Sequence, residues 1–265
     1  MRVEKNNIAL ITTVVNFGLY AKTSRRFPTG IQHFVIDGRN GMHGIDSIVY
    51  MFKKLKKYNI KWLIMADEDV IFNDEDYIFD LINLLNKNNY LCCGVRDGGV
   101  IKHRNYNPFA INTFFSIINF EKLKSIFNIS KIKKHQYIRK GEFNDDLGNA
   151  IFNYNKESLY EQYYCFYFWL RRNGGRILFL NSKMGDDAIS NKLFSPEGLE
   201  LLTHTWYARS YGINQTQTKR IDSLLNGFNF RNYSPPTPIY FKDRRFALRK
   251  LLRKSKKRIE MKLKK

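Results

Sequence analysis

Short apolar segments alternate with amphipathic segments over the first hundred residues. Four segments are apolar and rich in β-branched residues, as expected of buried parallel strands: Ile8–Val15, His33–Asp37, Trp62–Ala66 and Tyr90–Val95. Apolar residues recur at helical spacing from Ile45 to Leu55. They do so again in a segment that ends near Leu85, for which Asn73 or Asp74 is the predicted helix cap. This alternation predicts an α/β fold with a mixed, mainly parallel sheet and helices on both faces.

The rest of the chain has a less regular pattern. Residues 97–110 form a predicted loop rich in Gly, Asn and Pro, which is either a functional flap or a disordered surface loop. We predict a helix from Ser158 to Arg172 and a strand over Ile177–Leu180. Prolines at 235, 236 and 238 mark the expected end of the globular part. We therefore expect a domain over residues 1–240 with halves 1–100 and 101–240, followed by a tail over 241–265.

Three consecutive carboxylates, Asp67-Glu68-Asp69, end the third apolar segment and precede another apolar triplet. Burying charge is costly unless it is paired, and no Lys or Arg lies within several residues. A divalent cation is the expected partner, because Mg²⁺ and Mn²⁺ take carboxylate ligands. The alternative is that Asp69 only caps a turn while the other two face water. Asp37 also ends a predicted strand, so it falls on the same rim of the sheet, where ligands of such folds bind.

The order of these segments carries a resemblance. A strand, a strand ending in Val35-Ile36-Asp37-Gly38, a glycine-rich turn, a helix, and then a strand with Asp67-Glu68-Asp69 resemble the GT-A glycosyltransferases, particularly bacterial family-2-like enzymes of surface polysaccharide synthesis. The resemblance covers roughly residues 8–180. It implies a Rossmann-like GT-A fold in which an Asp-any-Asp motif, here Asp67 and Asp69, holds Mn²⁺ or Mg²⁺ against a nucleotide-sugar diphosphate. Glu68 should point to the other side and serve packing or capping.

Further donor-site candidates follow from the same comparison. Some GT-A enzymes complete the metal shell with a His from the C-terminal part of the domain, which makes His204 a candidate ligand; the alternative is a core His beside aromatic residues. Arg209 could reach a phosphate with its planar guanidinium. The residues assigned to the nucleotide sugar, expected to be a UDP-sugar, are Thr13, Asp37, Arg39, Asp67 and Arg209.

An inverting transfer needs a carboxylate that deprotonates the acceptor hydroxyl. The family places this base near the start of a helix that ends in a glycine before a strand, which makes Glu161 the first candidate. Its neighbour Gln162 replaces the second acid that is usual there. Two acidic pairs compete with Glu161, namely Asp145-Asp146, of which Asp146 is the weaker alternative, and Asp186-Asp187. Either pair could equally be a helix cap or a solvated turn.

Charge and cysteine content refine this picture. The 265 residues carry a net charge of +21, which favours anionic partners. The three cysteines show no zinc-ligand spacing and suit a reducing compartment. The apolar stretch Ile8–Val15 is too short to span a bilayer and lacks the layout of a signal peptide. We therefore expect a cytoplasmic protein.

About half of the excess charge lies in the last 24 residues, where 13 basic side chains face two acidic ones. Apolar residues lie near one helical stripe of this tail: Leu248, Leu251, Leu252, Ile259 and Leu263. A basic amphipathic helix is typical of a segment on an anionic membrane surface, here the cytoplasmic face of the inner membrane. The alternatives are a disordered basic tail and, ranked lower because no nucleic-acid module accompanies the charge, nucleic-acid binding.

These observations predict a metal-dependent glycosyltransferase that moves a sugar from a nucleotide sugar to a glycan or lipid-linked acceptor in capsule, O-antigen or lipooligosaccharide synthesis. The enzyme alternative is a nucleotidyltransferase of related fold. Such an enzyme should carry a glycine-rich stretch with a basic residue just after the first strand, and the segment found there, Asn16-Phe17-Gly18, matches that requirement poorly. A non-catalytic basic protein that binds membranes or nucleic acid is the other alternative, but it gives no reason for carboxylates at the end of a buried strand.

Overall fold

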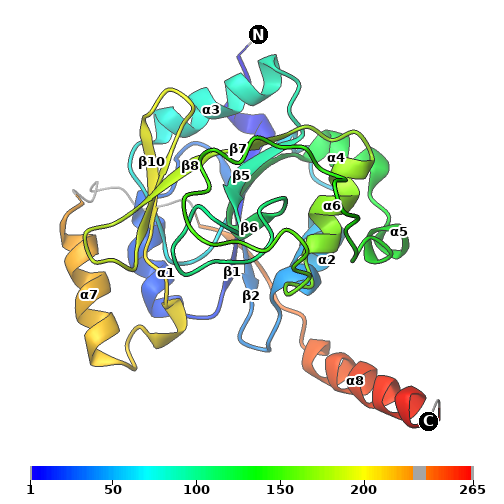
Figure 1. Ribbon diagram of the computed structural model, residues 1–265. Coiled ribbons are helices and arrows are strands. Elements are labelled where there is room, and N and C mark those ends of the chain that lie inside the picture. The colour runs from blue at the N-terminus through cyan, green and yellow to red at the C-terminus, as the bar shows by residue number, and fades with distance from the viewer. Residues whose placement is uncertain (1, 229–236, 264–265) are drawn as a thin grey trace.

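The computed structural model describes residues 2–228 and 237–263, and the side chains up to residue 255 (Figure 1). The strands of the larger sheet are β1 (Ile8–Val14), β2 (Gln32–Asp37), β3 (Trp62–Ala66), β5 (Cys92–Arg96), β6 (Ile111–Asn119), β7 (Ile177–Phe179) and β11 (Ile239–Phe241). Those of the smaller sheet are β4 (Val70–Phe72), β8 (Asn181–Met184), β9 (Asn191–Phe194) and β10 (Glu200–His204). The α-helices are α1 (Phe17–Thr23), α2 (Gly44–Leu55), α3 (Glu75–Lys87), α4 (Phe120–Ile126), α5 (Ile129–Lys133), α6 (Tyr164–Arg172), α7 (Gln215–Asn226) and α8 (Phe246–Leu263).

The larger sheet has the order β11-β2-β1-β3-β6-β5-β7, in which only β6 runs against its neighbours. Side chains alternate between its faces. In β1, Ala9 and Ile11 pack in one core with α2, whereas Ile8 and Leu10 pack in the other with α3. The predicted mixed, mainly parallel sheet with helices on both faces is confirmed.

The predicted helix from Ser158 is wrong at its start, because α6 begins at Tyr164. The side chain of Gln136 binds backbone groups that the first turn of the predicted helix would have paired. Its amide nitrogen donates to the carbonyls of Leu159 (3.1 Å) and Glu161 (2.9 Å), and its amide oxygen accepts from the N–H of Cys165 (3.0 Å). The residues before α6 therefore run as an irregular segment whose polar groups are satisfied by a neighbouring loop.

The smaller sheet, which the apolar pattern did not predict, is antiparallel with the order β4-β10-β9-β8. Strand β4 follows Asp69 directly, and β10 pairs with it so that Phe72 faces Leu202 and Val70 faces His204. This register brings the end of β10 to the carboxyl end of β3, across more than 130 residues of sequence.

The loop over residues 97–110 packs against the body of the protein. Val100, Ile101 and Phe109 are buried, and Gly98 pairs with Asn105 in an isolated β-bridge. A Cβ on Gly98 would lie 2.1 Å from the carbonyl oxygen of Tyr106, so the close approach of the two backbone segments requires glycine. The alternative of a disordered surface loop is therefore wrong.

The C-terminal segment returns to the sheet before it leaves the body. Strand β11 pairs in parallel with β2, and α8 then extends away from the sheet (Figure 1). Leu248, Leu251 and Leu252 are exposed on α8. The predicted proline boundary at 235 and 236 and the side chains of the predicted stripe at 259 and 263 lie outside the described part of the structure. Among the described residues, none of the helices has the length and hydrophobicity that crossing a bilayer requires.

Candidate functional site

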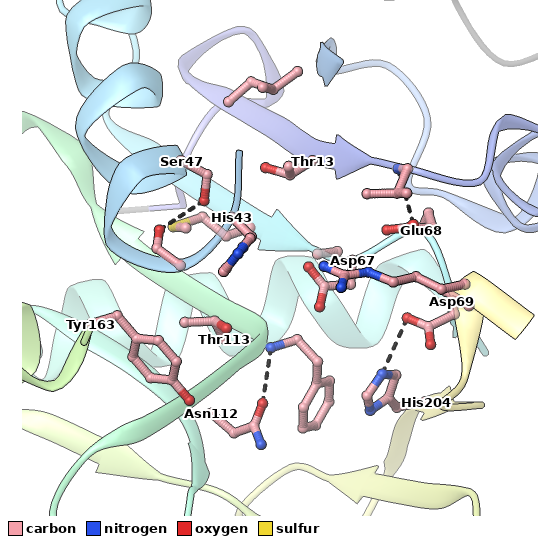
Figure 2. Close-up of a pocket in the computed structure, with 18 of the residues that line it drawn as sticks. Thr13, His43, Ser47, Asp67, Glu68, Asp69, Asn112, Thr113, Tyr163 and His204 are labelled. Carbon is pink, nitrogen blue, oxygen red and sulfur yellow. Dashed lines mark hydrogen bonds and ion pairs between the residues drawn. The ribbon is translucent and has the colours of Figure 1, made fainter. Parts of the chain in front are cut away.

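Asp67, Asp69 and His204 meet at the carboxyl end of β3 (Figure 2). One ligand atom from each lies within 4.8 Å of the others. Nε2 of His204 is 3.1 Å from Oδ1 of Asp69. The two aspartates come from the turn between β3 and β4, and the histidine ends β10, so the pairing of β4 with β10 assembles the group.

Backbone and ring contacts fix the positions of these three residues. The N–H of Asp67 donates to the carbonyl of Phe114 (2.9 Å), and the N–H of Thr205 donates to the carbonyl of Asp69 (3.0 Å). The His204 ring stacks on Phe114, with 4.2 Å between ring centroids and 9° between planes. The backbone of both aspartates and the ring of His204 are therefore fixed by the surrounding structure, which is what a preorganised site requires.

The electrostatics of the group fit a divalent cation. Burial raises the pKa of Asp67 well above its usual value, and the neighbouring carboxylates of Asp69 and Glu68 raise it further, while Arg209 lowers it in part. The Asp67 carboxylate forms no hydrogen bond or ion pair with any other residue that the structure describes, and the buried Nδ1 of His204 likewise has no partner there. Two carboxylates and an imidazole with unsatisfied polar atoms match the ligand preferences of a metal such as Mn²⁺.

Glu68 lines the same pocket as the two aspartates, so the expectation that it points to the other side is wrong (Figure 2). Its carboxylate accepts hydrogen bonds from the N–H groups of Val15 (3.1 Å) and Asn16 (3.2 Å). Burial, followed by the charge of Asp69, raises its pKa to about 7. Glu68 thus secures the junction between β1 and α1, in agreement with the packing or capping role expected for it.

A cavity of about 540 Å³ opens above the three residues. One wall consists of Thr13 and the start of α2, including His43 and Ser47. The opposite wall carries Arg104 and Glu161. Residues that follow β10 close a third side: Trp206, Tyr207, Ala208, Arg209 and Ser210. A cavity of this size accommodates a ligand as large as a nucleotide sugar.

Three of the assigned site residues do not line this cavity, and neither do the competing acids Asp186 and Asp187. Asp37 is bound by Arg39 through two contacts (2.9 and 2.7 Å) and by Lys242 (3.2 Å), and the pairing with Arg39 is the largest of the effects that hold its pKa well below the usual value. Asp146 is exposed and accepts a hydrogen bond from the N–H of Gly148 (2.8 Å), as in a solvated turn. The structure therefore brings together Thr13, Asp67, Asp69, Glu161, His204 and Arg209, and leaves Asp37, Arg39 and Asp146 outside.

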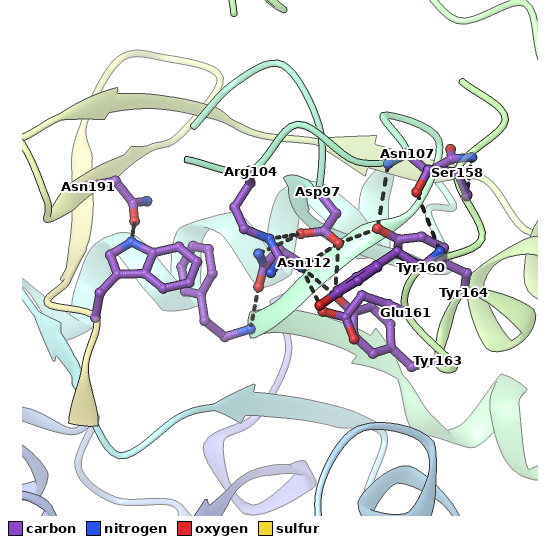
Figure 3. Close-up of polar contacts among 12 residues, drawn as sticks. Asp97, Arg104, Asn107, Asn112, Ser158, Tyr160, Glu161, Tyr163, Tyr164 and Asn191 are labelled. Carbon is purple, nitrogen blue, oxygen red and sulfur yellow. Dashed lines mark hydrogen bonds and ion pairs between the residues drawn. The ribbon is translucent and has the colours of Figure 1, made fainter. Parts of the chain in front are cut away.

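Glu161 belongs to a buried polar network that sequence reasoning missed (Figure 3). Arg104 donates to Glu161 (3.0 Å) and makes two bonds of 2.7 Å to Asp97, which is fully buried. Asp97 also accepts from Asn112 (2.7 Å), from the hydroxyl of Tyr163 (3.0 Å) and from that of Tyr164. The sequence did carry a signal for Asp97, because this residue comes two positions after the predicted strand over 90–95 and so lies near a strand end.

The backbone is strained where the chain leaves β10. Trp206 and Tyr207 both have φ near 60°, a left-handed conformation that costs non-glycine residues about 1 kcal/mol or more each. The Trp206 ring lies 4.3 Å from the His204 ring and donates its N–H to Asn191 (2.7 Å). The strained pair turns the chain so that Tyr207 and Arg209 reach the mouth of the cavity.

No protein-family model matches the chain, and no curated protein matches its sequence. Comparison of folds matches 45 chains of solved structures, among them the following three. One is the mannosyltransferase PcManGT from Pyrobaculum calidifontis in complex with GDP-Man and Mn²⁺, which is 9% identical with a TM-score of 0.34. The match covers 46% of this chain and 47% of PcManGT, so it spans about half the length of PcManGT. The protein A197 from STIV is 13% identical (TM-score 0.38; 74% and 93% covered). A glycosyltransferase involved in the glycosylation of the major capsid of PBCV-1 is 14% identical (TM-score 0.44; 82% and 98% covered).

Proposed function

We propose that this protein is a metal-dependent glycosyltransferase that uses a nucleotide-sugar donor. The observation that carries the proposal is the group of Asp67, Asp69 and His204 at the end of a central strand, at the base of a cavity of about 540 Å³. Two carboxylates and an imidazole beside a large cavity suit a cation that is shared with the phosphates of a ligand. The order of strands and the Asp-any-Asp motif in the sequence support the same assignment.

Each group in the cavity has a role in this reaction. Asp67, Asp69 and His204 would hold Mn²⁺ or Mg²⁺, and the nitrogen ligand favours Mn²⁺ because Mg²⁺ prefers oxygen. A cation held there would supply positive charge to stabilise the departing nucleoside diphosphate. Arg209, exposed at the cavity mouth, supplies a second cation for the phosphates.

We assign the general base to Glu161. Its carboxylate lies on the wall of the cavity, where an acceptor hydroxyl could enter, and it accepts only one hydrogen bond from Arg104 among the described residues. A free oxygen therefore remains to take the proton of the acceptor as the bond between the sugar and the diphosphate breaks. Asp146, the weaker alternative, lies outside the cavity.

The finer assignments follow from the sequence. We propose a UDP-sugar as donor and a glycan or lipid-linked acceptor of bacterial surface polysaccharide synthesis, handled on the cytoplasmic face of the membrane. Residues 1–100 would then form the donor half and residues 101–240 the acceptor half.

The test measures nucleoside diphosphate release from a panel of nucleotide sugars with Mn²⁺, with Mg²⁺ and after chelation. Asp69→Asn should lower the rate about 100-fold or more, because it removes a ligand charge, and should weaken Mn²⁺ binding measured directly by calorimetry. Asp80→Asn is the matched control, since Asp80 is exposed on α3. Full activity of Asp69→Asn, or undiminished turnover after chelation, would refute the metal assignment.

A further inference from the structure

A cluster of basic side chains lies between α2 and the start of α8, outside the cavity described above. These side chains line a shallow depression of about 560 Å³, here called the basic basin: Lys53, Lys54, Lys242, Arg244, Arg245 and Arg249. Asp243 is the only acidic residue among its lining residues, so the basin carries a net charge of +5. Two of its lysines come from α2, about 190 residues before the other four, so the fold and not the tail alone creates this concentration of charge.

Most of the charge in the basin is uncompensated. Lys242 pairs with Asp37 (3.2 Å) and Arg249 with Asp243. The side chains of Lys53, Arg244 and Arg245 form no ion pair within residues 2–228 and 237–255. The ammonium of Lys54 lies over the rings of Tyr50 (5.3 Å) and Phe241 (5.6 Å). Like charges held this close together repel one another, and a polyanionic partner relieves the repulsion.

A mainly apolar groove of about 490 Å³ adjoins the basin and shares part of its lining, including Tyr50 and Lys53. Asp243 and Arg249 are shared as well. The rest of the groove is lined by the apolar residues Met42, Val49, Phe246 and Leu252 and by the charged residues Asp46 and Arg253. Beside the groove, α8 exposes Leu248, Leu251 and Leu252, each with roughly 60% of its surface accessible. Apolar and cationic surfaces therefore lie next to each other on one face.

Specific contacts attach the start of α8 to the folded domain. Arg253 pairs with Asp46 of α2 (3.1 Å), and Lys250 donates to the carbonyl of Gly41 (2.7 Å). The amide of Asn40 donates to the carbonyl of Asp243 (2.9 Å). The basin and the groove are consequently features of the folded protein and do not depend on a free tail.

We propose that this face binds an anionic phospholipid of a bilayer, with the headgroup phosphate in the basic basin and part of an acyl chain in the apolar groove. Charge complementarity selects the phosphate, and the adjoining groove together with the exposed leucines selects a partner that also has hydrocarbon. A nucleic acid would use the charge but has no use for the groove. The site stands on its own residues and does not depend on the reaction proposed for the cavity.

The test is co-sedimentation of the full chain with vesicles of phosphatidylcholine, alone or with one third phosphatidylglycerol. The triple variant Lys53→Glu/Arg244→Glu/Arg245→Glu should weaken binding to the anionic vesicles about 100-fold or more, since each basic contact contributes roughly 1 kcal/mol. The charge-matched control, Lys87→Glu/Lys131→Glu/Lys219→Glu, changes exposed lysines on α3, α5 and α7 and should bind within about threefold of the wild type.

A second pair of variants tests the groove. Leu252→Asp, which places a charge in the groove, should weaken binding to the anionic vesicles, whereas Leu199→Asp, at an exposed position elsewhere, should not. Unchanged binding of the basin variant would mean that the distal tail alone holds the membrane, and an equal loss in both triple variants would mean that only net charge matters. Either result overturns the proposal, as would binding of Leu252→Asp to the anionic vesicles that is as strong as that of the wild type.

Discussion

Replacing Asp97 with Asn should destabilise the protein strongly, although it exchanges only one carboxylate oxygen for an NH₂ group. Asp97 is fully buried, and five donors converge on its carboxylate. Oδ1 accepts from Arg104 and Asn112, and Oδ2 accepts from Arg104, Tyr163 and Tyr164. In whichever orientation the Asn side chain is held, its NH₂ group faces at least two of these donors.

The magnitude follows from the charge that remains. The Arg104 side chain is 16% exposed, and its remaining carboxylate partner, Glu161, is 28% exposed and offers one contact. Removing one partner of a buried ion pair costs about 3–5 kcal/mol, so we expect the free energy of unfolding to fall by about 4 kcal/mol. A domain of ordinary stability retains its fold after such a loss. The rate of nucleoside diphosphate release should fall as well, because Arg104 would no longer hold Glu161 at the cavity wall.

Urea unfolding followed by tryptophan fluorescence measures the effect, with the exposed Asp80→Asn as the matched control. The double variant Asp97→Asn/Arg104→Met removes both charges, so its loss should be smaller than the sum of the two single losses by about 2 kcal/mol. A loss below about 1 kcal/mol in Asp97→Asn, or a coupling near zero in the double variant, would refute the buried ion pair.

Two further predictions concern the loop before α6 and the turn after β10. Glu142 accepts two charged hydrogen bonds from Arg172 (2.6 and 2.7 Å), and these bonds are the main reason why its pKa falls to about 2. The stabilisation that Glu142 contributes is therefore complete above the unfolded pKa near 4.5 and is lost as the pH falls from there through 2. Glu142→Gln should therefore lower the free energy of unfolding by about 1.5 kcal/mol at pH 7 but hardly at pH 2, and an equal loss at both pH values in urea titrations would contradict this assignment. Tyr207→Gly should raise the free energy of unfolding by about 0.5–1 kcal/mol, because glycine adopts the left-handed backbone without strain and the Tyr207 side chain is half exposed. Tyr207→Val should lower the free energy of unfolding. If thermal unfolding shows the Gly variant to be less stable than the Val variant, this turn is not strained.

The part of the fold that could be predicted is the part whose elements are long and periodic. The alternating segments from Ile8 to Val95 were placed to within a few residues, because each buries one face or both faces against neighbours that are close in sequence. The smaller sheet could not be predicted, since its strands are three to five residues long and two of them are rich in polar residues.

The candidate site shows the same division. Asp67 and Asp69 were predictable because a buried strand precedes them. His204 was a candidate from the resemblance to enzymes that add a C-terminal histidine to the metal shell, but the register that joins it to Asp69 could not be predicted. Asp37 was placed on the correct rim, but its pairing with Lys242 depends on β11, which joins the sheet from the far end of the chain. Such long-range pairings are set by tertiary packing, and a local pattern does not encode them.

The antiparallel pairing of β4 with β10 also sets the order of events during synthesis. Asp69 and His204 are separated by 135 residues. At about 5–20 residues per second, a ribosome needs roughly 7 to 27 s to add that length of chain. Throughout this interval the nascent protein carries both aspartates without the histidine and without the strand that positions it. The last ligand of the proposed cation site thus arrives only when most of the chain has been made, so the assembly of the site is a late step of folding.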